Sequence, residues 1–281
     1  MTRLAARLDP AGCATLAEVL RLRAEATPDE VVHSYLADGE DDEVCQTFGE
    51  LDRRARAVAA VLQGLGMAGE RALLVHPPGL EFVAAFFGCL HAGAIPVPAY
   101  PPDPSRLGRT MPRLAGIVAD ARPRLVLTTA LVHSMREGLL AHGPQLGAVP
   151  WMATDNLDPD LSADWRPPRP DRDGVAFLQY TSGSTASPRG VMVTHANLRH
   201  NSREMARIGR FTPDSVFVSW LPSYHDMGLV GGVLQPMHVG FPVVLLSPLE
   251  MLARPERWLA AVSEHHATTS GGPDFAYALA A

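Results

Sequence analysis

A ten-residue stretch, TSGSTASPRG from Thr181 to Gly190, carries the clearest chemical signal in the sequence. Its small residues let successive backbone amides converge, and its hydroxyl groups add hydrogen-bond donors, which together can surround phosphate oxygens. Arg189 supplies a permanent positive charge in a planar fork that suits a phosphate. A flexible serine–glycine turn is the alternative interpretation. The apolar strands expected on either side and the cation near its end favour phosphate binding.

A second cluster lies at Ser223, His225 and Asp226, the three side-chain types of a hydrolase triad. All three fall within four residues, and the G-x-S-x-G turn that presents such a serine is missing, so this interpretation is poor. His225 taken alone fits either an active-site group or a hydrogen-bonded structural histidine. The sequence has neither paired cysteines nor a histidine cluster, so we expect no tightly held metal.

The composition excludes several kinds of site. All 24 basic residues are arginine, against 30 acidic ones, and the formal charge is −6. Without lysine there is no lysine Schiff base, no lysine general base and no Walker-type loop. A mildly acidic chain without basic runs also argues against nucleic acid as a partner, because such binding depends on clustered cations.

The expected location is the cytoplasm. Three unpaired cysteines indicate a reducing compartment, and the N-terminal MTRLAARLDP lacks the apolar core of a signal peptide. The most apolar run, from Phe82 to Ala99, contains His91 and two prolines, so we expect no membrane span.

Short apolar strands that alternate with helices position these residues and predict an α/β fold of mainly parallel, doubly wound sheets with flanking helices. The expected strands are 71–76, 94–97, 124–129, 149–153, 175–180, 191–194, 216–220 and 243–246. The expected helices are 47–66, 79–91, 111–121, 131–142, 196–208, 227–239 and 255–265.

The polar, proline-rich residues 155–173 are the best candidate for a connecting segment. They separate a first α/β subdomain, 1–154, from a segment that holds the TSGST loop, 174–281. The final residues, FAYALAA, have the character of a helix without a terminating residue. This pattern predicts that the chain is truncated at its C-terminal end.

The stretch LQYTSGSTASPRGVMVTHANLRHN closely resembles the phosphate loop of the adenylate-forming superfamily, which comprises acyl-CoA synthetases, luciferases and peptide-synthetase adenylation domains. That loop reads Y-T-S-G-S-T-G-x-P-K-G, so this sequence departs from it at Ala186 and Arg189. The segments TFGELDRRARAVAAVLQ, SWLPSYHDMGLVGG and ATTSGGPDFAYALA look like fatty acyl-AMP ligases, and the resemblance runs from about residue 15 to the end.

The resemblance implies an enzyme that activates a fatty acid with ATP. The products would be a fatty acyl-adenylate and pyrophosphate, Mg²⁺ would arrive with ATP, and an acyl carrier protein or polyketide synthase would accept the acyl group. The residues implied to bind the phosphates are Thr181, Ser182, Gly183, Ser184, Thr185, Arg189 and Gly190.

The same resemblance places His225 near the acyl carboxylate and the α-phosphate, as the expected catalytic residue. Tyr224 and Met227 are expected beside the substrate. Gly271 and Gly272 would border the acyl pocket and leave room for an apolar chain. A simple strand-to-helix turn at these two glycines is an equally good interpretation.

Parts of the family pattern are missing from the 281 residues: the adenine-binding segment, the acidic residues for magnesium and ribose, and a catalytic lysine. We therefore expect the chain alone to be inactive as a ligase. The alternatives are an acyl-CoA ligase, a peptide-synthetase adenylation domain, and a truncated binding module without catalysis.

Overall fold

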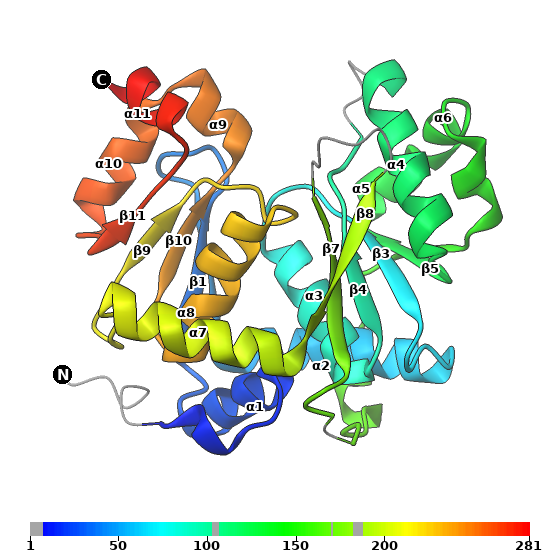
Figure 1. Cartoon of the computed structure of the whole chain (residues 1–281), viewed down its shortest axis with the longest axis horizontal. Coiled ribbons are helices and arrows are strands. Elements are labelled where there is room, and N and C mark those ends of the chain that lie inside the picture. The colour runs from blue at the N-terminus through cyan, green and yellow to red at the C-terminus, as the bar shows by residue number, and fades with distance from the viewer. Residues whose placement is uncertain (1–7, 103–106, 170, 182–187) are drawn as a thin grey trace. The chain divides into compact units, whose positions relative to one another are not determined.

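The computed structural model describes residues 8–102, 107–169, 171–181 and 188–281 (Figure 1). The chain divides into two compact units. The first comprises Met1–Asp52, Pro78–Leu80 and Ala196–Ala281, and the second comprises Arg53–Pro77 and Glu81–His195. The expected connecting segment, 155–173, lies wholly inside the second unit, because the chain passes between the units at residues 52–53, 77–81 and 195–196 instead.

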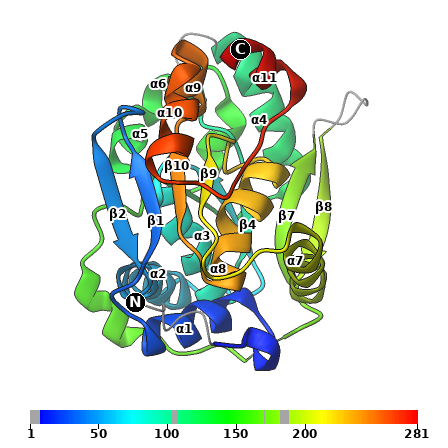
Figure 2. The same ribbon diagram turned by 90° about the vertical axis from the view of Figure 1, so that its left-hand side faces the viewer.

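The first unit is built on a five-stranded sheet in the order β11-β9-β10-β1-β2. Strands β1 (Val31–Leu36), β10 (Val243–Leu246), β9 (Phe217–Ser219) and β11 (Thr269–Ser270) run parallel. β2 (Glu43–Thr47) closes one edge antiparallel to β1, and Figure 2 shows the two side by side. All four residues of β10 are buried, as expected for a central parallel strand covered on both faces.

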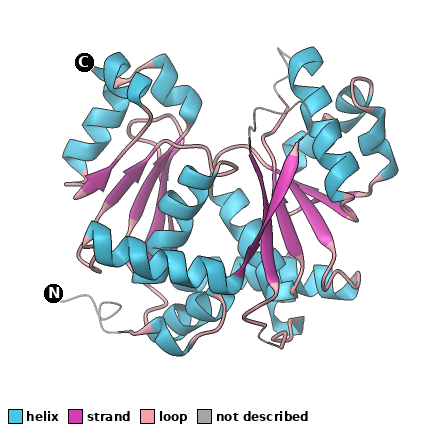
Figure 3. Ribbon diagram, viewed as in Figure 1, coloured by secondary structure: helices cyan, strands magenta, loops and turns pink. Residues whose placement is uncertain are grey.

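Helices surround this sheet (Figure 3). They are α1 (Leu16–Ala26), α7 (His195–Gly209), α8 (Gln235–Val239), α9 (Pro248–Ala253), α10 (Glu256–Glu264) and α11 (Asp274–Ala280). A capping box starts α1, because the Thr15 hydroxyl accepts from the Glu18 amide and the Glu18 carboxylate accepts from the Thr15 amide. One side of the sheet packs against α9, α10 and α11 in a core that includes Trp220, Met251 and Trp258.

The predicted single helix over 227–239 is wrong in its winding. Residues Met227–Leu234 form a π-helix, η6, and only Gln235–Val239 are α-helical. Pro236 has no amide proton, so the i→i−4 hydrogen bond that an α-helix needs there cannot form. π-Helical turns are rare in proteins, and those that occur often lie at functional sites.

A buried arginine closes the C-terminal end of α8. Arg23, from α1, is fully buried, and it donates to the carbonyl oxygens of Met237 at 2.8 Å and of His238 at 2.6 Å. These are carbonyls that a helix end leaves without a backbone partner. Burial lowers the pKa of Arg23 to about 10, so the guanidinium stays charged at neutral pH. Gly240, with φ of +92°, ends the helix directly against it.

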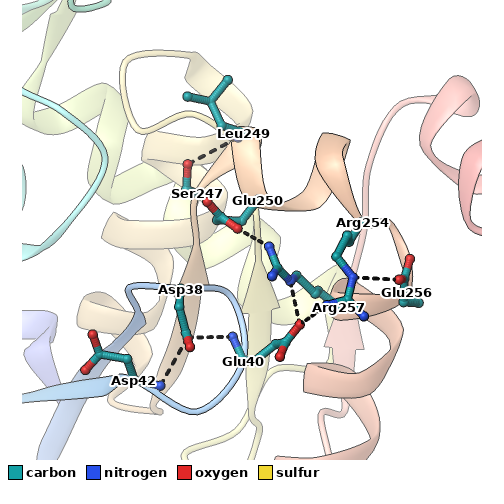
Figure 4. A network of polar contacts seen from close by, with 9 residues as sticks. All are labelled: Asp38, Glu40, Asp42, Ser247, Leu249, Glu250, Arg254, Glu256 and Arg257. Atoms are coloured by element: carbon teal, nitrogen blue, oxygen red, sulfur yellow. Dashed lines mark hydrogen bonds and ion pairs between the residues drawn. The ribbon is translucent and has the colours of Figure 1, made fainter.

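The turn between β1 and β2 is held by charged contacts, drawn in Figure 4. The Asp38 carboxylate accepts from the backbone amides of Glu40 at 2.9 Å and Asp42 at 3.1 Å, which lowers the pKa of Asp38. Arg257 on α10 donates to Glu40 at 2.9 Å and also contacts Glu250 on α9. The turn is therefore tied to two helices that are more than 200 residues away in sequence.

The second unit contains a parallel sheet in the order β4-β3-β5-β6. Its strands are β3 (Arg71–Val75), β4 (Ile95–Pro98), β5 (Leu125–Thr128) and β6 (Trp151–Ala153). A separate antiparallel pair, β7 (Val175–Thr181) and β8 (Arg189–Thr194), belongs to the same unit. The prediction of an α/β fold with mainly parallel sheets is confirmed.

The chain enters the second unit through α2 (Phe48–Gly64), and further α-helices of the described residues belong to this unit. They are α3 (Leu80–Ala92), α4 (Leu107–Ala121), α5 (Ala130–Ser134) and α6 (Arg136–Leu140). In the core, apolar residues of β3, β4 and β5 pack against α4, including Met111, Leu114 and Ile117. Over the described ranges, no helix is both long enough and apolar enough to cross a membrane.

Candidate functional site

The antiparallel pair β7–β8 frames the serine- and glycine-rich loop. β7 and β8 lie side by side (Figure 2). In the ladder between them Tyr180 pairs with Gly190, and Thr181 pairs with Arg189 in the last step. Partners in such a ladder lie about 4.5–5.5 Å apart at their Cα atoms. Thr181 and Arg189, both exposed, thus stand opposite each other at the open end of the hairpin. The predicted residues Ser182, Gly183, Ser184 and Thr185 lie outside the described residues.

Gly190 is required by close packing within this hairpin. A Cβ atom on Gly190 would lie 2.9 Å from Cζ and 3.1 Å from the hydroxyl oxygen of Tyr180. Real Cβ atoms essentially never come so close to a neighbour. The glycine after Arg189 therefore lets the Tyr180 ring lie flat against β8, a reason for a strand glycine that the sequence alone does not reveal.

Contacts with α4 hold the Tyr180 side chain in place. Its side chain is 7% exposed and belongs to the core that contains Leu114, Ile117 and Val118 of α4. Its hydroxyl donates to the carboxylate of Asp120, at 2.5 Å. Burial, and then the hydrogen bond and negative charge of Asp120, raise the pKa of Tyr180. The strand that leads into the loop thus ends on a neutral, anchored tyrosine.

The second group of predicted residues follows β9. His225 Nδ1 lies 2.7 Å from the Asp226 carboxylate, and the two side chains are 58% and 60% exposed. The Met227 amide also lies within hydrogen-bond distance of Nδ1, at 3.4 Å, so Asp226 and the start of η6 both contact this side of the ring. Asp226 also accepts from the Met227 amide at 2.7 Å and so caps the first turn of η6.

The segment around His225 is bent tightly by a second glycine. A Cβ atom on Gly228 would lie 2.2 Å from the carbonyl oxygen of Pro222, and the His225 amide donates to that same oxygen at 3.0 Å. Tyr224 lies half-buried within this turn, and Met227 just after it is 50% exposed. The turn presents His225 and Met227 outward together, next to Tyr224.

The two predicted glycines have different surroundings. A Cβ on Gly272 would lie 2.8 Å from Cζ2 of Trp220, so Gly272 permits close packing against that ring. A Cβ on Gly271 would meet only the hydroxyl of Tyr277, at 3.9 Å. Gly271 therefore has the more open surroundings, whereas Gly272 leaves room for Trp220, which follows β9, and for Ala276 of α11.

His225 and Gly271 follow neighbouring strands of the same sheet. β9 ends at Ser219 and β11 ends at Ser270, and the two strands are parallel neighbours. The residues that follow them, including His225 and Gly271, leave from the carboxyl edge of the sheet. In open α/β sheets, ligands bind outside the carboxyl ends of the strands. The expected substrate residues thus lie in the first unit, and the loop at 181–190 lies in the second.

Comparison with known proteins identifies the family. The model of a family described as AMP-binding enzyme matches residues 20–280, so the chain belongs to that family. The resemblance to adenylate-forming enzymes predicted from the TSGST stretch is confirmed.

Individual relatives narrow the similarity. The chain is 42% identical over 264 residues to the medium-chain-fatty-acid–[acyl-carrier-protein] ligase JamA of Moorena producens, covering 94% of this chain and 45% of that protein. It is 36% identical over 276 residues to the long-chain-fatty-acid–AMP ligase FadD23 of Mycobacterium tuberculosis, covering 95% and 47%. The chain spans about half the length of these curated relatives.

A solved structure has the same fold. It is a fatty acyl-adenylate ligase from Legionella pneumophila in complex with acyl adenylate and pyrophosphate, with a TM-score of 0.86 and 36% sequence identity. The match covers 95% of this chain and 45% of that one. The L. pneumophila structure thus shows this fold in a protein that holds both an acyl adenylate and pyrophosphate.

Proposed function

We propose that the chain supplies the pyrophosphate-binding and acyl-binding part of a fatty acid–AMP ligase. In this reaction the carboxylate oxygen of a fatty acid attacks the α-phosphorus of ATP, the bond to the β,γ-pyrophosphate breaks, and a fatty acyl-adenylate forms. The observation that carries the proposal is the match to the L. pneumophila ligase in complex with acyl adenylate and pyrophosphate.

The chemistry requires two anions to meet, so the site must neutralise charge and align the nucleophile. We assign the hairpin end to the leaving pyrophosphate, with Arg189 as the cation. The other residues assigned to the phosphates are Thr181, Ser182, Gly183, Ser184, Thr185 and Gly190. Mg²⁺, bound to the phosphates of ATP, would add positive charge at the same place.

His225 is assigned to the catalytic position beside the acyl carboxylate. Its contact with Asp226 through Nδ1 orients the ring, and we assign Nε2, on the opposite side of the ring, to face the acyl carboxylate. Tyr224, Met227 and Gly271 are assigned to the surroundings of the acyl chain. Gly272 is assigned with them, although its contact with Trp220 also gives it a packing role.

The proposed acceptor of the acyl group is an acyl carrier protein or a polyketide synthase. Two relatives support this, since JamA and the TtuA protein of Teredinibacter turnerae are both named fatty-acid–[acyl-carrier-protein] ligases. CoA is the second candidate, because the FadD21 protein of M. tuberculosis, 39% identical over 275 residues, is named a putative fatty-acid–CoA ligase. We propose a cytoplasmic location, where ATP and either acceptor are found.

Binding of inorganic pyrophosphate to the 281-residue chain, measured by titration calorimetry, tests the phosphate assignment. Arg189→Ala removes the cation at the hairpin end, and we expect affinity to fall about tenfold or more, the effect of losing a charge-assisted contact. Arg207→Ala is the matched control, because Arg207 is 70% exposed and pairs with Glu204 on α7. Equal affinities of the wild type and the Arg189→Ala variant would rule out the assignment.

A further inference from the structure

One face of α4 holds both ends of the TSGST loop. Two described residues lie on either side of residues 182–187: Tyr180, which precedes Thr181, and Pro188, which precedes Arg189. Each contacts α4, Tyr180 through Asp120 and Pro188 through Gly116. All of these residues belong to the second unit.

The contact at Tyr180 joins packing to a directed hydrogen bond. The ring is buried in the core formed with α4, and the hydroxyl reaches the exposed Asp120 carboxylate at 2.5 Å. A hydrogen bond to a carboxylate is shorter and stronger than one between neutral groups. The packing alone would fix the depth of the ring, and the hydrogen bond fixes where the end of the ring lies along α4.

The contact at Pro188 depends on the absence of a side chain. A Cβ atom on Gly116 would lie 2.9 Å from Cγ and 3.1 Å from Cδ of Pro188. The proline ring therefore lies directly on the helix backbone. Gly116 and Asp120 are four residues apart, and positions i and i+4 share one face of a helix.

The ladder links the two contacts to each other. Tyr180 pairs with Gly190, whose missing side chain lets the Tyr180 ring lie against β8. The next pair is Thr181 with Arg189, at the open end of the hairpin. Tyr180 is thus the chain neighbour of Thr181, and its ladder partner Gly190 is the chain neighbour of Arg189.

We infer that Tyr180 and Asp120 are positioning residues for the pyrophosphate-binding hairpin, because their hydrogen bond holds Thr181 and Arg189 in place on α4. This inference rests on the proposed function, which gives the hairpin its ligand. Neither residue touches the phosphates. Their effect on the ligand passes through the position of Arg189.

Native-state proteolysis measures this positioning without any ligand. Trypsin cleaves after arginine, and Arg189 is exposed at the end of the hairpin. In Tyr180→Phe and Asp120→Ala we expect cleavage after Arg189 to speed up about tenfold, the effect of losing one hydrogen bond to a charged group. The double variant should be no faster than either single variant, because both changes break the same bond.

Two controls separate positioning from general destabilisation. Cleavage after Arg113, inside α4, reports opening of the helix itself. Tyr100→Phe is the matched variant, since the Tyr100 hydroxyl also donates at 2.5 Å to α4, at the Thr110 carbonyl, which is ten residues before Asp120. The inference requires faster cleavage after Arg189 alone, in the Tyr180 and Asp120 variants alone. Equal acceleration at Arg113 and Arg189, or no acceleration, overturns it.

Pyrophosphate titration of the same variants gives the second readout. We expect Tyr180→Phe and Asp120→Ala to weaken binding about fivefold to tenfold, and Tyr100→Phe to leave it unchanged. Selective cleavage after Arg189 with unaltered pyrophosphate affinity overturns the positioning role. A wild-type chain that does not bind pyrophosphate contradicts the proposed function instead, and the cleavage rates then still decide whether the hydrogen bond holds the hairpin end.

Discussion

Individual buried groups set how the protein responds to acid. His33 and His76 are both almost fully buried, and burial lowers their pKa values to about 4 and about 3. His76 Nε2 lies 2.9 Å from the Thr154 hydroxyl, and its Nδ1 has no hydrogen-bond partner among the residues that the structure describes. Both rings are therefore neutral in the folded protein, whereas in the unfolded chain they take up protons near pH 6.5.

This difference predicts loss of stability on acidification. Below about pH 6.5 the two histidines bind protons in the unfolded state but not in the folded state. Each histidine therefore lowers the free energy of unfolding by about 1.4 kcal/mol per pH unit, until the pH reaches the pKa of that histidine in the folded protein. Urea unfolding at pH 7, 6 and 5 measures the slope, and His76→Gln should reduce it. The exposed His142 provides the control, His142→Gln, which should leave the slope unchanged. Equal slopes for the wild type and His76→Gln would contradict the account.

At the scale of elements, helix ends and turns depend on single glycines. Gly240 ends α8 with φ of +92°, and a Cβ there would lie 2.2 Å from a terminal nitrogen of the buried Arg23. A side chain at this position meets two costs at once, a left-handed backbone and displacement of a buried cation.

Gly240→Ala should therefore lower the free energy of unfolding by about 3 kcal/mol. Gly64→Ala is the control, because a Cβ at Gly64, the last residue of α2, meets nothing within 4 Å. We expect that change to be neutral within about 0.5 kcal/mol or stabilising. Urea midpoints of the two variants decide the matter, and similar midpoints would show that Arg23 does not need the space.

The elements illustrate how far sequence patterns reach. The strands around the TSGST loop are predicted to within two residues, 175–180 and 191–194 against Val175–Thr181 and Arg189–Thr194, because glycine and serine mark the break clearly. The π-helix η6 is missed, because apolar periodicity does not distinguish its winding from an α-helix. Its tight entry depends on the approach of Gly228 to Pro222, which only coordinates show.

The candidate site shows the same limit. The TSGST loop and the His225 segment are recognisable because their chemistry lies within a few consecutive residues. The partnership of Tyr180 with Asp120 joins residues 60 positions apart, and no local pattern marks it. Gly190 makes room for the Tyr180 ring, but in the sequence it cannot be distinguished from a glycine that belongs to the loop.

At the scale of the whole molecule, each compact unit is built from segments that are far apart in the sequence. The proline-rich segment 155–173 has the composition of a linker, yet it lies inside the second unit. The indole nitrogen of Trp165 donates to the His91 carbonyl at 2.9 Å, and Arg56 lies over the Trp165 ring. A polar, proline-rich composition thus predicts an irregular backbone, and that backbone is held on the unit by the buried Trp165 and by hydrogen bonds between Arg166 and Gln63.

The whole molecule also sets what the chain can do by itself. It spans about half the length of its relatives and contains no lysine. We therefore expect the 281-residue chain to show no fatty-acid-dependent ATP–pyrophosphate exchange. Joined to the remaining part of the M. producens relative, with which it is 42% identical, it should gain that activity.

ATP–pyrophosphate exchange by this chimera is the most direct test of the central claim. The account predicts exchange that requires both ATP and a fatty acid, and that falls at least tenfold with Arg189→Ala, the loss of one charge-assisted contact. A chimera that is folded and binds ATP, but exchanges pyrophosphate equally well without a fatty acid or not at all, would contradict it.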